Sequence, residues 1–194
     1  MTLVPLVEGD DFAPDDQTAM RAARSGYGQL LQTWQAIANS PGLFSAYLPF
    51  LQKVAGAGDL DVRLKILVAL RVAVLNRCDY TLSHRWSAGT TNSIPAELLT
   101  AAAEGTYAGP DDRIRAALEV TQLITLGAPT VSRTDEADII PATVRARLQS
   151  LFTPPELVEL VMGIGVWNAL TRFHRALGLE LDMPAAPDSL RALL

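Results

Sequence analysis

Val62–Leu75 reads VRLKILVALRVAVL, and this stretch decides the fold of the chain. Apolar residues occupy nearly every position, so a helix here has almost no polar face to turn toward water. A helix that is apolar on all sides must be covered by other elements. We therefore expect Val62–Leu75 to form the central helix of the protein.

The flanking sequence shows helical spacing of apolar residues, and strand-like alternation is absent over any useful length. Pro and Gly residues divide it into segments of helical length. The expected helices span residues 15–24, 29–39, 43–54, 62–75, 78–87, 96–103, 111–126, 141–152 and 154–177. We expect a loop over 129–138 and one helical turn in the tail. The pattern predicts an all-α bundle of about eight helices.

Several helix ends carry local signals. Asp15 suits the N-cap of the first helix, which is expected to end before the Ser25-Gly26 break. Thr153 with Glu156 three residues later forms a capping box that opens the longest helix. The helix that begins at Cys78 is expected to stop before Ala88-Gly89.

The chain has 194 residues, which suits a single domain spanning 1–194 with short N- and C-terminal extensions. Its formal net charge is −5 and no dense Lys/Arg cluster occurs, so nucleic acid is not an expected partner. The first residues lack the features of a secretory signal, and the apolar runs are too short to cross a bilayer. We expect a cytoplasmic protein with no membrane contact.

Metal and disulfide chemistry find little support in the sequence. Cys78 is the only cysteine, and His84 and His174 are the only histidines. One cysteine excludes an intrachain disulfide and a Cys-based zinc site. We therefore expect no metal site and no cofactor.

Three segments resemble the carboxymuconolactone decarboxylase and alkylhydroperoxidase D-like superfamily. They are TWQAIANSPGLFSAYLPFLQKV at 33–54, LKILVALRVAVLNRCDYTLSHRWSAG at 64–89, and FTPPELVELVMGIGVWNALTRFHRALGLELD at 152–182. The resemblance covers most of residues 33–182. It implies an alkylhydroperoxidase D-like helical bundle, usually assembled as a homo-oligomer, commonly a dimer, trimer or hexamer.

The peroxidase branch of this superfamily has a C-x-x-C pair, a His four residues after the second Cys, and a Glu twelve residues before the first. The corresponding residues here are Cys78, Thr81, Arg85 and Ile66. Thr81 cannot resolve a sulfenic acid, and neither Ile66 nor Arg85 can relay a proton at ordinary pH. A two-cysteine peroxidase cycle is therefore impossible, and only His84 remains as a proton carrier on this helix.

Helical rotation of about 100° per residue predicts which of these side chains meet. Cys78, Thr81 and Arg85 fall on one stripe of the helix, and Tyr80 and His84 are neighbours at i, i+4. By the same rotation, His84 lies about 120° from Cys78. Direct pairing of Cys78 with His84 is therefore not expected.

The candidate catalytic residues are His84, as acid or base, and Cys78, as a thiolate favoured by the start of a helix. The planar fork of Arg85 suits a substrate carboxylate, and Arg71 is a second candidate anion anchor. The walls of a substrate pocket are expected from Tyr80, Thr81 and Trp167.

Structural roles compete with these assignments. The alternative for Cys78 is a small buried residue at a corner between two helices. The alternative for Arg85 is a surface side chain that forms a salt bridge. Arg71 interrupts an apolar helix and needs a partner such as Glu156, Glu159 or a helix C-terminus. We expect His174 at a surface or an interface. The small residues of the last long helix, Gly163, Gly165 and Ala169, are expected to pack against another helix.

Three functions remain open. The leading hypothesis is a lyase- or isomerase-type enzyme that acts on a small organic acid or lactone by non-redox acid-base catalysis. The second is a one-cysteine peroxidase or redox sensor, which requires an exposed Cys78 of low pKa. The third is a noncatalytic binding or scaffold protein that keeps the fold.

Overall fold

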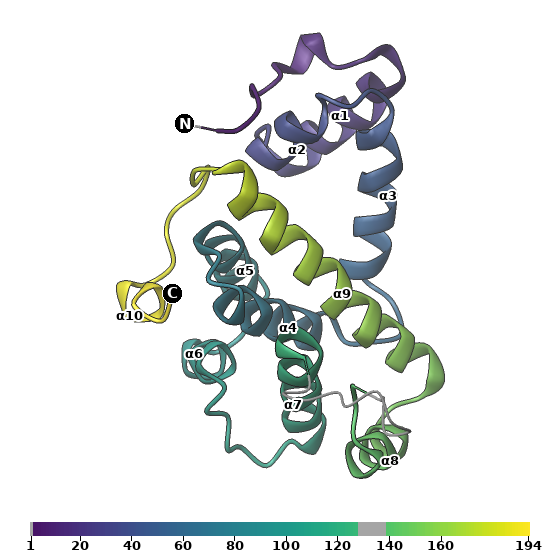
Figure 1. Ribbon diagram of the computed structural model, residues 1–194, viewed down its shortest axis with the longest axis vertical. Coiled ribbons are helices and arrows are strands. Elements are labelled where there is room, and N and C mark those ends of the chain that lie inside the picture. Colours follow the sequence, from purple (N-terminus) through teal and green to yellow (C-terminus); the bar gives the residue numbers. More distant parts are fainter. Residues whose placement is uncertain (1, 128–138) are drawn as a thin grey trace.

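The computed structural model describes residues 2–127 and 139–194, and within them the chain forms ten α-helices and one short 3₁₀ turn, η1 (Figure 1). The helices are α1 (Pro14–Tyr27), α2 (Gln32–Ile37), α3 (Leu43–Ala55), α4 (Val62–Leu75), α5 (Asp79–Thr91), α6 (Ala96–Glu104), α7 (Asp112–Leu126), α8 (Ala142–Leu151), α9 (Pro154–Leu177) and α10 (Asp188–Arg191). The predicted all-α class is confirmed, and eight of these helices have seven or more residues. No helix in these residues has the length and apolarity that a bilayer crossing demands.

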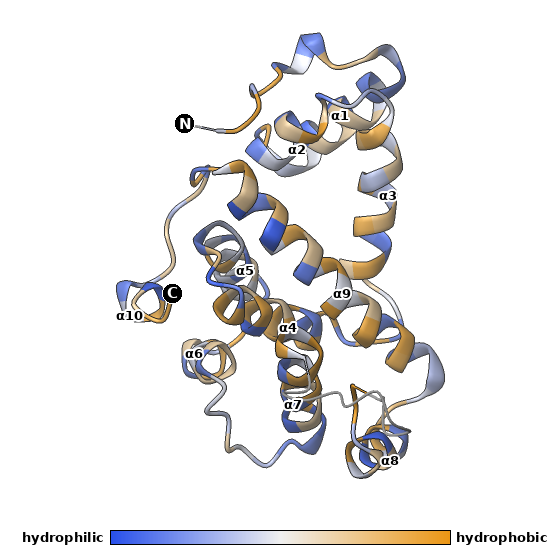
Figure 2. Ribbon diagram, viewed as in Figure 1, coloured by the Kyte–Doolittle hydropathy of each residue, from blue (hydrophilic) through white to orange (hydrophobic). Residues whose placement is uncertain are grey.

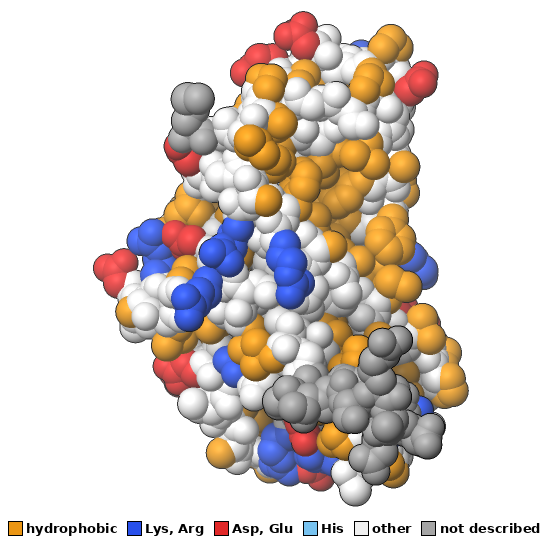
Figure 3. Space-filling model, viewed as in Figure 1, with side chains coloured by type: hydrophobic (Ala, Val, Ile, Leu, Met, Phe, Trp, Pro, Cys, Tyr) orange, Lys and Arg blue, Asp and Glu red, His pale blue; other side chains and the backbone are white. Residues whose placement is uncertain are grey.

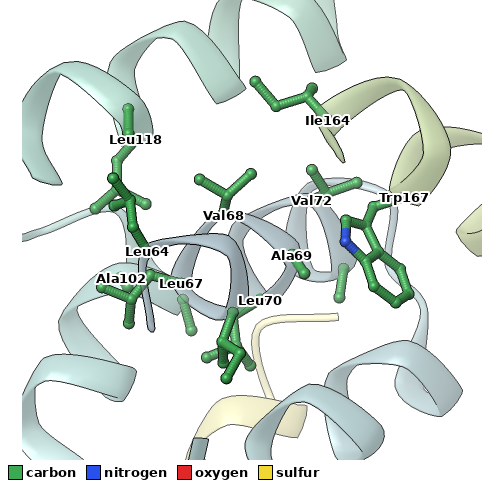
Figure 4. Close-up of a cluster of buried hydrophobic side chains, with 14 of the residues drawn as sticks. Leu64, Leu67, Val68, Ala69, Leu70, Val72, Ala102, Leu118, Ile164 and Trp167 are labelled. Carbon is green, nitrogen blue, oxygen red and sulfur yellow. The ribbon is translucent and has the colours of Figure 1, made fainter. Parts of the chain in front are cut away.

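Helix α4 lies at the centre, as its sequence predicts, and contacts α5, α6, α7 and α9. Figure 2 shows that α4 is mostly apolar, whereas the surrounding helices carry both apolar and polar residues. Its side chains meet those of the covering helices in one continuous core (Figure 4). Leu67, Leu70 and Val72 are almost completely buried there. Burying each such side chain contributes about 1.5–3 kcal/mol, so covering α4 drives the assembly of the four neighbours.

The two charged residues in the buried part of α4 have partners at its edges. Lys65 is buried and pairs with Glu159 at 2.7 Å while donating to the Gly56 carbonyl. Arg71 donates to the carbonyl of Ala103, in the last turn of α6, and to Gln122. The prediction that a helix C-terminus satisfies Arg71 is confirmed, whereas Glu159 serves Lys65 instead.

The N-terminal helices α1, α2 and α3 form a second apolar cluster, seen at the top of Figure 1. Phe12, Met20, Trp34 and Phe44 are its largest buried side chains. The ring of Phe44 meets those of Phe12 and Trp34 at centroid distances of 5.5 and 6.0 Å. This cluster is separate from the core around α4, and the space between the two holds the cavity described below.

Several predicted helix ends are wrong by a turn or less. Helix α1 begins at Pro14, with Ala13 rather than Asp15 as its N-cap, and it continues through Ser25-Gly26 to Tyr27. Helix α5 continues through Ala88-Gly89 to Thr91. Glycine weakens a helix by only about 1 kcal/mol, and burial of neighbouring side chains outweighs that cost. The predicted loop at 129–138 lies outside the described residues.

Helix α9 begins with the predicted capping box of Thr153 and Glu156. Its small residues do not pack as expected, because Gly165 and Ala169 are exposed, and a side chain added at Gly163 or Gly165 would meet no other atom within 4 Å. The same helix exposes three large apolar side chains, Val158, Val161 and Met162. This face suits a contact with another copy of the chain, and the homo-oligomer stays a prediction.

A buried carboxylate fixes the start of α3. Asp16 is fully buried and accepts hydrogen bonds from the backbone N–H groups of Gly42 (2.9 Å) and Ser45 (2.8 Å), which are free donors at the N-terminus of α3. Gly42 adopts a left-handed conformation with φ of 80°, which favours glycine. Asp16 thus ties α1 to α3.

We expect Asp16→Ala to lower the free energy of unfolding by about 2 kcal/mol, because two buried donors lose their acceptor. Asp15→Ala is the matched control, since Asp15 is the exposed neighbour in the same helical turn, and it should change stability by less than about 0.5 kcal/mol. Urea denaturation measures both. Equal effects of the two substitutions would contradict this role of Asp16.

Candidate functional site

A cavity of about 400 Å³ lies between the N-terminal helices and the α5–α9 side of the core. Its walls are mostly apolar and aromatic. The lining residues come from α1, α2, α3, α5 and α9 and the segments next to them. They include Tyr27, Thr33, Trp34, Tyr47, Leu48, Leu51, Gln52, Tyr80, Thr81, His84, Arg85, Trp167, Leu170 and His174. In Figure 3, apolar side chains gather on the surface where α3 runs beside α9.

Helix α5 supplies four of the polar groups of this cavity, Tyr80, Thr81, His84 and Arg85. Residues spaced by four along a helix lie on the same side, so the pairs 80/84 and 81/85 both face the cavity. The predicted site residues on α5 are therefore brought together, apart from Cys78. Trp167 reaches the same cavity from α9, as predicted.

Arg85 brings a positive charge into this apolar space. Its guanidinium carbon lies 4.7 Å from the centre of the Trp167 ring, and its Nε is buried without a hydrogen-bond partner. Burial lowers the pKa of Arg85. Within residues 2–127 and 139–194, no carboxylate forms an ion pair with this side chain. Among the described residues Arg85 therefore lines the cavity without an ion pair, and it is not the surface salt bridge that the sequence also allowed.

His84 is oriented by a carboxylate from a distant part of the chain. Its Nε2 lies 2.7 Å from Asp182 Oδ1, and its ring stacks on Tyr80 at a centroid distance of 4.4 Å. The hydroxyl of Tyr80 donates to Asp182 Oδ2 at 2.6 Å, and the backbone N–H of Gln32 donates to the same oxygen at 2.8 Å. Burial alone would raise the pKa of Asp182, but these hydrogen bonds outweigh it and hold the pKa below its ordinary value.

His174 forms a second buried hydrogen-bond network. Its Nδ1 lies 2.9 Å from the Thr81 hydroxyl and its Nε2 lies 3.0 Å from the Thr33 hydroxyl. Burial, assisted by electrostatic interactions with His84 and Arg85, lowers the pKa of His174 to about 3. The ring is therefore neutral at ordinary pH. The expectation of a surface or interface position is wrong, since His174 is only 5% exposed and lines the cavity.

Cys78 lies just before α5 and is 1% exposed. Its thiol donates to the Thr81 hydroxyl at 3.3 Å and accepts from the Thr81 N–H at 3.5 Å. Burial raises the pKa of Cys78, although the bonds with Thr81 oppose the rise. Its place at the helix start is as predicted, but the thiolate expected there is disfavoured, and Cys78 is not a lining residue of the cavity.

Arg71 is also absent from the cavity. It opens onto a separate surface cleft beside Tyr107 and Arg115, and its guanidinium is already bonded to Ala103 and Gln122. The prediction that Arg71 anchors the same substrate as His84 is therefore wrong. Arg71 sits on the side of α4 that faces α6 and α7, whereas the cavity lies beyond α5.

Two residues of the site escaped the sequence analysis as functional candidates, Asp182 and His174. Asp182 follows α9 in an irregular segment, so no helical spacing relates it to His84. His174 shares its helix with Trp167 and is seven residues away, which places both on one face of α9. The seven-residue spacing from Trp167 is the sequence signal that could have placed His174 at the cavity. Among the described residues, no group of three His, Cys, Asp or Glu side chains is arranged to hold a metal.

The low pKa of His174 predicts a loss of stability in mild acid. Between pH 6.5 and about 3 the unfolded chain binds a proton at this residue that the folded protein does not, so the free energy of unfolding falls as pH falls, by at most about 1.4 kcal/mol per pH unit. His174→Gln should flatten this dependence. Chemical denaturation of both proteins between pH 7.5 and 5 measures it, and parallel curves would contradict the prediction.

Comparisons with known proteins agree with this architecture. Residues 41–123 match the carboxymuconolactone decarboxylase family. The fold resembles a peroxidase-related protein from Silicibacter sp. TM1040, with 20% identity over 96% of this chain and 93% of that one at a TM-score of 0.73. It also resembles an alkylhydroperoxidase AhpD core protein from Ralstonia eutropha JMP134, with 13% identity over 98% and 94% at a TM-score of 0.76.

A third structure is a debrominase, Bmp8, in which a cysteine is replaced by alanine, in complex with 2,3,4-tribromopyrrole. It shares 18% identity over 100% of this chain and 96% of its own, with a TM-score of 0.74. No curated protein matches the sequence. Residues 41–123 are thus similar to the carboxymuconolactone decarboxylase family, and the chain shares the fold of the alkylhydroperoxidase D-like structures.

Proposed function

We propose that this protein binds a small organic anion in the cavity and moves one of its protons by non-redox acid-base catalysis, as a decarboxylase or isomerase does. The observation that carries the proposal is the unpaired guanidinium of Arg85 in an apolar cavity that also contains the His84–Asp182 pair.

The charge of Arg85 favours an anionic ligand. A buried charge without a partner is costly, and a bound carboxylate or enolate would supply the missing acceptor. The guanidinium is held over Trp167, so its position is set before a ligand arrives. Tyr27, Tyr47 and Tyr80 lie near enough to interact electrostatically with Arg85. Burial raises the pKa of Tyr47 and of Tyr80, so these two hydroxyls stay neutral.

The contact with Asp182 decides which nitrogen of His84 is basic. Asp182 is ionised at neutral pH because its pKa is lowered, so its Oδ1 accepts a hydrogen bond from the Nε2–H group of His84. The neutral imidazole then carries its lone pair on Nδ1. Among the described residues no hydrogen bond to Nδ1 is formed. Nδ1 is therefore the atom that can take a proton from a ligand, with Asp182 stabilising the imidazolium that results.

These groups suffice for enolate chemistry. In an isomerisation, Nδ1 takes a proton from the carbon next to a carbonyl, the C–H electron pair forms an enolate, and the same nitrogen returns the proton to another carbon. In a decarboxylation, Nδ1 first takes up a proton from solvent, the C–C bond to the carboxylate breaks, CO₂ leaves, and the imidazolium gives this proton to the enolate carbon. Arg85 holds the anionic group of the ligand in both cases.

The two alternatives have less support. A one-cysteine peroxidase needs an accessible thiolate, whereas Cys78 is buried and its pKa is raised. A scaffold protein without chemistry has no need of an unpaired cation in an open cavity of about 400 Å³. The debrominase neighbour, whose complex contains a flat ring, supports the inclusion of ring-shaped ligands in a substrate screen.

Arg85→Gln should weaken the binding of benzoate about 10- to 100-fold, the loss expected for one charge-assisted hydrogen-bonded contact, and leave the neutral benzamide unaffected. The variant should be as stable as the wild type or more so, because an unpaired buried charge is removed. The exposed Arg63→Gln is the matched control. Calorimetry measures the two affinities and thermal denaturation measures the stability. If benzamide binds to the wild-type protein as tightly as benzoate does, the cavity is not an anion site.

His84→Ala should slow deuterium exchange next to the ketone of 4-oxocyclohexanecarboxylate by about 100-fold or more, because the proton acceptor is lost. Asp182→Asn should lower kcat with little change in KM and alter the pH profile, since it disturbs the His84 tautomer. Asp79→Asn, on the same helix but outside the cavity, is the control. Exchange is followed by NMR in D₂O, and a His84→Ala protein at the wild-type rate rules out this mechanism.

A further inference from the structure

The cavity offers a ligand one permanent positive charge. Among the residues that the structure describes, Arg85 is the only lining residue of the Lys or Arg type. The charge of a protonated His84 is matched by Asp182 at 2.7 Å, and the pKa of about 3 keeps His174 neutral. Neither histidine is therefore left to neutralise a second negative group on a ligand.

The rest of the wall carries no second cation among the described residues, and several of its hydroxyls are already hydrogen-bonded. The hydroxyls of Thr33 and Thr81 are both within 3.0 Å of the ring nitrogens of His174, and the hydroxyl of Tyr80 is bonded to Asp182. The other lining side chains are uncharged. Most are apolar or aromatic, among them Leu48, Leu51, Leu170, Trp34 and Trp167, and the polar groups are the Gln52 amide and the hydroxyls of Tyr27 and Tyr47. Such a surface stabilises a hydrocarbon body and leaves a second carboxylate without a cationic partner.

We infer that the ligand of this cavity is a monoanion with an apolar, ring-shaped body, a cyclic or aromatic monocarboxylate, and that dicarboxylates are excluded. This inference rests on the proposed function and adds the substrate class to it. The single carboxylate meets Arg85 beside Trp167, and the ring fills the space between α1, α3 and α9. A volume of about 400 Å³ has room for roughly ten non-hydrogen atoms with space left for solvent.

The exclusion of a second charge is a matter of specificity. A dianion of the same ring size gains nothing further from Arg85 and must place its other carboxylate against uncharged side chains. A small anion such as acetate meets the same guanidinium but leaves the apolar walls uncovered. Both should bind less tightly than a ring-shaped monoanion.

The test measures affinity by calorimetry for five probes: benzoate, 3-phenylpropionate, terephthalate, acetate and benzamide. We expect 3-phenylpropionate and benzoate to bind tightest, with terephthalate and acetate at least tenfold weaker than benzoate. If terephthalate binds as tightly as benzoate, the monoanion inference is overturned while the anion site stands. If benzamide equals benzoate, the proposed function itself is lost.

A second test uses a variant that is expected to gain affinity for the dicarboxylate, so it does not depend on detecting the weak binding of terephthalate to the wild-type protein. Leu51→Arg adds a second cation from α3 to the lining of the cavity and should raise the terephthalate affinity at least tenfold relative to benzoate. Leu43→Arg adds the same charge to α3 at an exposed position outside the cavity and should change neither affinity. Circular dichroism checks folding, and the wild-type probe series decides the inference even if Leu51→Arg does not fold. A folded Leu51→Arg protein with an unchanged ratio contradicts it.

Discussion

The burial of α4 on every side is the constraint on which the rest of the structure depends. Because this helix has no face that tolerates water, α5, α6, α7 and α9 must all lie against it. The position of α5 is therefore set by its neighbour, and with it the direction in which Tyr80, Thr81, His84 and Arg85 point. The two cations in the middle of α4, buried Lys65 and partly exposed Arg71, have hydrogen-bond partners at the edges of the core and lie outside the cavity.

The cavity exists because the N-terminal helices build an apolar cluster of their own. The two clusters meet through a polar seam, where Thr33 contacts His174 and Gln32 contacts Asp182. Side chains that fill the centre of each cluster leave the space between them partly open. Arg85 stands at this boundary, with Trp167 of one cluster beneath it and the tyrosines around it. A charge without a partner and a space without side chains thus occur at the same place, which is typical of a ligand site.

Much of the fold was predictable because apolar periodicity reports burial directly, as in α4, α7 and α9. The site was predictable only where its residues share α5. The helical rotation placed Cys78 on a stripe with Thr81 and Arg85, yet Cys78 is the N-cap with φ of −110° and ψ of 99°, so the regular rotation does not extend to it. Asp182 was not predictable as a partner of His84, since only the packed tertiary structure brings an irregular segment 98 residues away to that ring.

Asp182 has a further consequence through the elements that it joins. Its two oxygens hold the imidazole on α5 and the first turn of α2 at the same time. Any separation of α2 from α5 that widened the space would take the Gln32 amide away from this carboxylate and loosen the ring that it orients. The His84 ring therefore keeps this orientation only while the N-terminal helices rest on the core, which couples the geometry of the proposed base to the packing of α2.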